Sequence, residues 1–346
     1  MIDIDGSKKG GSGTILRLAV SLSAITHQSI HLYNIRQKRP QPGLKPQHLE
    51  AVLTAARLSD AEVRGAVLGS REIWFEPKEI NGGKIDAAIG TAGSIPMLLM
   101  TVLPICAFGN EPVELHISKG GTDTTNAPTI NYIRHILLPV LRLMNITATL
   151  DVLKYGYYPK GNGEIAAKIE SSKRLNPLQL ETFGNLKKIN GLSICTFLAE
   201  RKVAERQAEA AKTYIKQRGW ASDIQTLNDT SNPLQKGSSI TLWAETDSGC
   251  IIGADAIGKI KKSSEKVGEE AAKKLIDEIT VQPTVDAHLA DMLIPYVALA
   301  REDSTYLTGT ISEHLETNIW VTEEILNVKF RTEKNGRLFS VRKIAS

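Results

Sequence analysis

One histidine of the chain lies among side chains that could orient it as a nucleophile. His314 belongs to the segment GTISEHLETN, where Ser312, Glu313, Thr317 and Asn318 are its neighbours. A neutral imidazole is nucleophilic near pH 7, and a neighbour that binds one ring nitrogen leaves the other free to react. A lone histidine in a polar loop is more often simply exposed, so both interpretations of this pattern stay open.

Two other segments have the composition of a phosphate-binding site. In GSKKGGSGTILR, residues 6–17, small residues precede a helical pattern, and backbone N–H groups at a helix N-terminus attract anions. The loop IRQKRPQPGLKPQHL holds four basic residues among three prolines that restrict its backbone: Arg36, Lys38, Arg39 and Lys45. Guanidinium groups held in this way suit bidentate phosphate contacts. A flexible turn and a solvated basic loop would explain either segment alone.

Two glycine-rich segments, KGGTDTTNAP and YGYYPKGNGEI, lie at the ends of expected strands. Glycine lets the backbone approach a ligand closely, so these turns fit the walls of a binding cleft. Ordinary hairpin turns would account for either one. A fourth segment, DAHLADMLIPYVALA, has an apolar helical pattern and precedes the candidate nucleophile.

Helices and strands in a recurring order must position these motifs. Helical spacing of apolar residues predicts helices at 15–25, 47–58, 94–107 and 129–143. Shorter runs predict strands at 29–35, 61–67, 72–75, 84–89, 113–118, 148–155 and 163–169. The later elements loosely repeat the order of the earlier ones, which is suggestive of related units.

The composition changes between residues 185 and 276, after a polar stretch typical of a linker. Strands are expected there at 191–198 and 238–245, and charged helices at 203–217 and 264–279. We therefore expect residues 185–276 to form an inserted α/β module within a large domain built from residues 1–184 and 277–346. A helix at 288–301, and a closing helix and strands within 318–330 and 337–344, complete the large domain.

Composition excludes several classes of protein. With 346 residues and 42% hydrophobic content, the chain can bury a large core and is not disordered. No signal peptide is evident and no apolar run reaches the roughly 18 residues that span a bilayer, so a cytoplasmic location is expected. Cys106, Cys195 and Cys250 are far apart, which argues against disulfides and a zinc site. Because the net charge is only +4, any nucleic-acid surface must be local.

The order and spacing of four motifs are more specific than any one of them. GGTDTTNAP, YGYYPKGNG, HLAD and EHLETN, with an insertion between the second and third, resemble the RNA 3′-terminal phosphate cyclase family over residues 4 to about 342. The resemblance implies an α/β (α+β) fold, with a large domain of three repeated units and a smaller inserted α/β domain. Each unit would have a four-stranded sheet and two helices. It also implies that ATP adenylates a histidine, that AMP passes to an RNA 3′-phosphate, and that a 2′,3′-cyclic phosphate forms.

The same resemblance assigns roles to particular residues. His314 corresponds to the adenylated histidine, and four residues correspond to contacts with phosphate and RNA: Arg17, Arg36, Arg39 and Gln47. The ATP site would comprise His288 and Pro128, which sandwich the adenine, with Leu289, Ala290, Asp291, Met292 and Met100. A divalent cation, Mg²⁺ or Mn²⁺, is expected, but its ligand is unassigned because Gly10 stands where the family carries a glutamate. Since every motif assigned to ATP lies outside residues 185–276, the inserted module is expected to be dispensable for adenylation.

Three interpretations follow from these patterns. The leading one is an active, ATP-dependent cyclase that acts on RNA 3′-phosphate ends and has no membrane partner. The alternative is a non-catalytic, cyclase-like RNA-binding protein of ribosome biogenesis. Gly10, Met100 and Met292 favour that alternative, because methionines replace two glutamines of the family's ATP site, whereas His314 favours the enzyme. In a third interpretation, an enolpyruvyl-transferase-like enzyme, EHLETN has no evident role.

Overall fold

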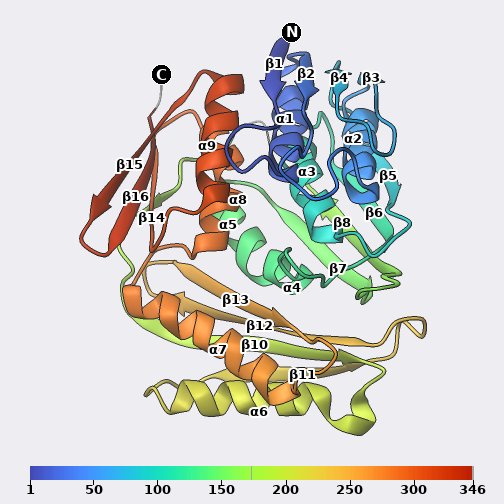
Figure 1. The fold of residues 1–346 in the computed structure, drawn as a ribbon. Coiled ribbons are helices and arrows are strands. Elements are labelled where there is room, and N and C mark those ends of the chain that lie inside the picture. Colours follow the sequence, from blue (N-terminus) through green and yellow to red (C-terminus); the bar gives the residue numbers. More distant parts are fainter. Residues whose placement is uncertain (173, 345–346) are drawn as a thin grey trace.

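Three four-stranded sheets with one common topology form the larger part of the molecule (Figure 1). The computed structural model describes residues 1–172 and 174–344. The first sheet has the order β1-β2-β4-β3, from β1 (Ile2–Asp5), β2 (Ile30–Tyr33), β3 (Glu62–Arg64) and β4 (Ile73–Glu76). β1 and β2 are parallel, and the other two pairings are antiparallel.

The second and third sheets repeat this arrangement. The second has the order β5-β6-β8-β7, from β5 (Gly83–Ala88), β6 (Val113–Gly120), β7 (Ala148–Lys154) and β8 (Gly163–Ile169). The third has the order β9-β14-β16-β15, from β9 (Gln179–Leu180), β14 (Ser304–Thr308), β15 (Lys329–Asn335) and β16 (Leu338–Ile344). In both, the first two strands are parallel and the fourth lies between the second and third. The expected α/β fold with three repeated units is confirmed.

Each of these units contributes two helical segments to a shared apolar core. The first contributes α1 (Gly13–Thr26) and α2 (Pro46–Leu58), and the third contributes α8 (Ala287–Leu299) and α9 (Glu313–Leu326). The second contributes α3 (Ile95–Ala107) and a continuous segment of α4 (Ile130–Tyr132), the π-helical η1 (Ile133–Leu137) and α5 (Leu138–Leu143). α1 packs against α2, α3 and α9, and α8 packs against α9. The helices therefore meet between the sheets, where the largest cluster of buried apolar side chains lies.

A fourth sheet, which has a different topology, is formed by the residues between β9 and α8. We call this sheet and its helices the insert. Its order is β11-β10-β12-β13, from β10 (Leu186–Thr196), β11 (Asp223–Asp229), β12 (Gly237–Thr246) and β13 (Ile251–Ile257). α6 (Val203–Lys216) and α7 (Ser264–Val281) cover one face and share a separate apolar core with the sheet; a short 3-10 turn, η2 (Ala199–Arg201), precedes α6. The opposite face turns towards α4 (Figure 1).

The sequence patterns located most helices within a few residues but did not predict five strands. These are β1, β9, β11, β13 and β14. β9 has only two residues and is a strand because it pairs with β14, far away in sequence. The three cysteines are free and buried, in line with the expectation of no disulfide framework. Among the described residues, no helix combines the length and the apolar character needed to cross a membrane.

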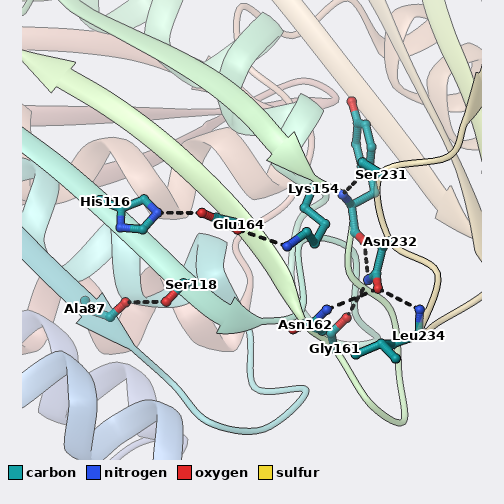
Figure 2. Close-up of polar contacts among 11 residues, drawn as sticks. Ala87, His116, Ser118, Lys154, Gly161, Asn162, Glu164, Ser231, Asn232 and Leu234 are labelled. Atoms are coloured by element: carbon teal, nitrogen blue, oxygen red, sulfur yellow. Dashed lines mark hydrogen bonds and ion pairs between the residues drawn. The ribbon is translucent and has the colours of Figure 1, made fainter.

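One buried amide joins the insert to the second glycine-rich turn (Figure 2). Asn232, in the loop between β11 and β12, donates from Nδ2 to the carbonyls of Tyr155 and Gly161, at 2.7 and 2.9 Å. Its Oδ1 accepts hydrogen bonds from the Asn162 side chain and the Leu234 backbone N–H. All four hydrogen-bonding positions of this amide are therefore used, and the turn is fixed against the insert.

The second glycine-rich turn consequently serves the contact between the two parts of the molecule. The ring of Tyr157 lies over Gly237, where an added Cβ would be only 2.1 Å from it. No residue of the turn 155–163 lines the cavity described below. The expectation that this turn forms a wall of the binding cleft is therefore wrong. The carbonyls of Tyr155 and Gly161 and the ring of Tyr157 face the insert instead.

We predict that Asn232→Ala destabilises the protein by about 2–4 kcal/mol, because two buried carbonyls lose their donors. Urea unfolding followed by circular dichroism measures the change. Asn185→Ala is the matched control, since that amide binds Asp247 at an exposed site, and it should cost less than about 1 kcal/mol. Equal midpoints for the two variants would contradict the role given to Asn232.

Candidate active site

A cavity of about 560 Å³ lies where the central helices meet the insert. α1 and α9 contribute Thr14, Arg17, Leu18, Ser21, His314 and Asn318. α3, η1 and α8 contribute Met97, Met100, Leu137, His288, Asp291, Met292, Pro295 and Tyr296, beside the loop 125–128. The insert contributes Asp255, Ala256, Ile257, Lys259, Lys262, Glu270 and Lys274. The cavity thus joins polar, apolar and charged walls, as small-molecule sites commonly do.

His314 lies in the first turn of α9. The helix begins at Glu313, five residues before its expected start, because the Oγ of Ser312 caps it by accepting the Leu315 backbone N–H at 2.9 Å. The same Oγ donates to Asp291 Oδ1 on α8 at 2.6 Å. His314 is exposed, as one of the two open interpretations had it, but it lies on a helix and not in a loop, and the anchored N-terminus of α9 sets its position.

A threonine on α1 contacts the ring of His314. Nδ1 lies 3.4 Å from Thr14 Oγ1, and that oxygen also accepts a hydrogen bond from Arg17 at 3.0 Å. A hydroxyl oxygen can accept a second hydrogen, so a ring N–H at Nδ1 can point at Thr14. In that tautomer Nε2 keeps a free electron pair, which is what a nucleophilic imidazole requires.

The surroundings of His314 favour its neutral form. Partial burial is the main cause that lowers its pKa from the usual value, and the positive charges of Arg17 and Arg39 lower it further. Glu313 acts in the opposite direction. A histidine with a lowered pKa is largely unprotonated at neutral pH, so the ring is available as a nucleophile.

Three guanidinium groups gather beside this histidine. Burial, together with the charges of Arg36 and Arg39, lowers the pKa of Arg17 to about 10, so Arg17 stays protonated at neutral pH. Burial and Arg39 also lower the pKa of Arg36. In the described part of the chain, none of the three forms an ion pair with a carboxylate. Like charges held together in this way favour an anion such as phosphate.

Of the four residues expected to contact phosphate and RNA, only Arg17 lines the cavity. Arg36 donates to the carbonyls of Gln41 and Gly43, both at 2.8 Å, so part of its guanidinium group holds the basic loop in shape. Gln47 is also engaged, because its Oε1 accepts the backbone N–H of Ser94 at the start of α3. Arg39 is exposed at the edge of this group.

Only some residues of the α8 segment expected to bind ATP face the cavity, because α8 is a helix. His288, Asp291 and Met292 line the cavity, whereas Leu289 and Ala290 are fully buried in the apolar core, at 0% exposure. Residues one and two positions away from a helix face point elsewhere, so the assignment of Leu289 and Ala290 to the ATP site is not supported. Pro128 and Met100 also line the cavity.

The insert forms a wall of the cavity that no sequence motif indicated. Asp255 on β13 lines it, and Thr129 donates its backbone N–H to Asp255 Oδ2 at 2.7 Å. The geometry argues against the expectation that the insert is dispensable, because removing it would open the cavity on one side. Sequence patterns could not indicate a role for Asp255, because it is an isolated aspartate in an apolar strand. Its hydrogen-bond partner, Thr129, lies 126 positions away in the sequence.

A side chain from α9 occupies the space beside Gly10. A Cβ added at Gly10 would lie 3.3 Å from Cδ and 3.4 Å from Oε2 of Glu313, and the backbone N–H of Gly10 donates to Thr317. The described residues contain no cluster of three or more histidine, cysteine, aspartate or glutamate side chains suited to a metal. A single carboxylate beside a phosphate site still suits Mg²⁺, which commonly takes one or two carboxylates plus phosphate oxygens and water.

Comparison with known proteins gives one consistent result. A family model described as RNA 3′-terminal phosphate cyclase matches residues 8–332. Proteins named RNA 3′-terminal phosphate cyclase from Methanosarcina barkeri and Pyrococcus furiosus are 45% and 40% identical to the chain, each over 99% of both sequences. The protein of the same name from Pyrobaculum aerophilum is 42% identical over 97% of this chain and 96% of its own length.

We predict that His314 titrates with a midpoint below 6.5, because burial and the arginines disfavour its charged form. NMR of the imidazole carbon-bound protons across pH 4–9 measures this. Arg39→Gln should raise the midpoint by removing one positive neighbour. Lys38→Gln, in the same basic loop, should leave it unchanged. A midpoint above 6.5, or equal shifts in the two variants, would contradict the electrostatic account.

Proposed function

The chain belongs to the RNA 3′-terminal phosphate cyclase family, and from that premise we propose that it converts an RNA 3′-phosphate to a 2′,3′-cyclic phosphate at the expense of ATP. His314 is the residue that becomes covalently adenylated. The observation that carries this proposal is the position of His314, with a lowered pKa, in the cavity wall beside Arg17 and Arg39.

In the first step, Nε2 of His314 attacks the α-phosphorus of ATP. A P–N bond forms, the bond from that phosphorus to the bridging oxygen breaks, and pyrophosphate leaves. Thr14 supports the step by accepting the Nδ1 hydrogen, which keeps the reacting electron pair on Nε2. Arg17 lies close enough to stabilise negative charge on the phosphate, a role that fixed donors perform well in a partly dry site.

In the second and third steps, the RNA end takes over the adenylyl group and then releases it. An oxygen of the RNA 3′-phosphate attacks the α-phosphorus, the P–N bond breaks, and His314 is regenerated. The adjacent 2′-hydroxyl then attacks the RNA phosphorus, loses its proton and expels AMP. The group formed by Arg17, Arg36 and Arg39 supplies positive charge for two phosphates that must approach each other.

The remaining residues of the cavity hold the nucleotide. We assign the adenine to the space between Pro128 and His288, and the apolar contacts of the site to Met100 and Met292. Asp291 has a different task, because its carboxylate holds the cap of α9. Residues 185–276 are assigned to an inserted unit, and the separate apolar core of the insert supports this division.

A divalent cation, Mg²⁺ or Mn²⁺, belongs to this proposal. Glu313 would hold it, since its carboxylate lies beside Gly10 in the same turn as His314. Such a cation supplies positive charge that offsets the charges of the triphosphate. The non-catalytic alternative gains no support from the cavity, because a binding protein has no need of a neutral histidine beside an arginine group.

We predict that His314→Ala and His314→Asn abolish covalent labelling by α-labelled ATP, because neither side chain is a comparable nucleophile. Both should also abolish cyclisation, while binding of a 3′-phosphorylated RNA stays close to wild type. The label on the wild-type protein should be acid-labile and base-stable. His27→Ala, an exposed histidine at the opposite end of α1, is the control. If either His314 variant is labelled to the same extent as the wild type, His314 is not the adenylated residue.

For the cation, Mn²⁺ binding in the presence of α,β-methylene-ATP can be followed by electron paramagnetic resonance. Glu313→Gln should weaken Mn²⁺ binding by about tenfold, since the site has few protein ligands to lose. Glu316→Gln, another glutamate in the first turn of α9, should have little effect. If the two variants bind Mn²⁺ equally well, Glu313 is not the ligand.

A further inference from the structure

One carboxylate of the insert, that of Asp255, lies in the same cavity wall as Pro128 and His288, the two residues assigned to the adenine. Asp255 projects from β13 into the cavity wall. It accepts the backbone N–H of Thr129, the residue that directly follows Pro128. Its charge also interacts with His288, which lowers the pKa of Asp255 against the larger raising effect of burial. Asp255 therefore shares the cavity wall with Pro128 and His288, and it is hydrogen-bonded to the residue that follows Pro128.

The position of Asp255 is fixed by contacts on both sides of the strand. Thr129 Oγ1 is hydrogen-bonded to Thr241 on the neighbouring strand β12, at 2.8 Å. Lys274 on α7 donates to the backbone carbonyl of Asp255 at 3.0 Å. A carboxylate can accept about four hydrogen bonds, so binding to Thr129 leaves acceptor capacity on Asp255 for a ligand.

Four other side chains of the cavity are poorly suited to recognise a base. Met100 and Met292 offer thioethers, which are weak acceptors and no donors. Two lysines of the insert are engaged with a common partner, because Lys262 and Lys274 both form ion pairs with Glu270. Asp255 is a half-buried acceptor in the cavity wall, next to the proposed adenine position.

We propose that Asp255 accepts a hydrogen bond from the exocyclic amino group of adenine, so that the insert determines the preference for ATP over GTP. This inference rests on the proposed function, because it uses the assignment of adenine to the space between Pro128 and His288. Guanine carries a carbonyl oxygen where adenine carries its amino group. A carboxylate facing that oxygen would bring two acceptors together, and unpaired buried acceptors are strongly disfavoured.

The test is the nucleotide selectivity of Asp255→Asn. Calorimetry with α,β-methylene analogues of ATP and GTP measures binding without requiring transfer to His314. The ratio of the two affinities should fall by about tenfold or more, because an amide can donate to the guanine oxygen. The asparagine Oδ1 can still accept from Thr129, so the local structure should persist. Asp277→Asn, an exposed aspartate of α7, is the matched control and should keep the wild-type ratio.

A further arm of the experiment separates the base from the sugar. In one outcome, Asp255→Asn leaves the ratio of the ATP and GTP affinities unchanged but alters the ratio of the affinities for ATP and for 2′-deoxy-ATP or 3′-deoxy-ATP. In that case the carboxylate binds the ribose, and the proposal is overturned. An unchanged ratio in every pair overturns it as well. Failure of the wild-type protein to form a covalent label would contradict the proposed function, and the binding ratios would still decide the role of Asp255.

Discussion

The crowding of three positive charges at the start of α1 is the constraint on which the site depends. Arg17 is half-buried, its pKa is lowered by burial and by the charges of Arg36 and Arg39, and none of the three has a carboxylate partner in the described ranges. Such an arrangement is unfavourable without an anion, because like charges that are partly removed from water repel each other. Partial burial lowers the pKa of His314 most, and the charges of Arg17 and Arg39 lower it further, so the neutral form is favoured. In the proposed function, these arginines would both attract phosphate and favour the neutral, nucleophilic form of His314.

The repeated fold explains how distant segments reach this place. α1, α3 and the pair α8 and α9 come from three units of the same topology, and they meet between the sheets. Ser312 and Asp291 then fix one helix start against its neighbour, so His314 stands on a rigid element rather than a loop. The insert interrupts the third unit after β9 and closes the remaining side of the cavity. Asn232 ties it to the second glycine-rich turn.

Local patterns in the sequence predicted the local features and missed the long-range ones. Apolar periodicity located the helices, and the resemblance to the family implied roles for His314, Arg17, His288 and Pro128, all of which line one cavity. The start of α9 had a local signal that went unused, namely a capping Ser312 followed by Glu313 and Glu316. The periodicity of α8 would have excluded Leu289 and Ala290. Asp255 had no signal, because its importance comes from Thr129 in another part of the chain.

The central claim is that one imidazole carries the adenylyl group, and mapping the modified residue tests it most directly. The wild-type protein would be incubated with ATP and Mg²⁺ without RNA, digested at neutral to basic pH, and examined by tandem mass spectrometry. Our account predicts a single AMP adduct on the peptide that contains His314, which disappears after mild acid. An acid-stable adduct on a lysine, or an adduct on another histidine, would contradict it.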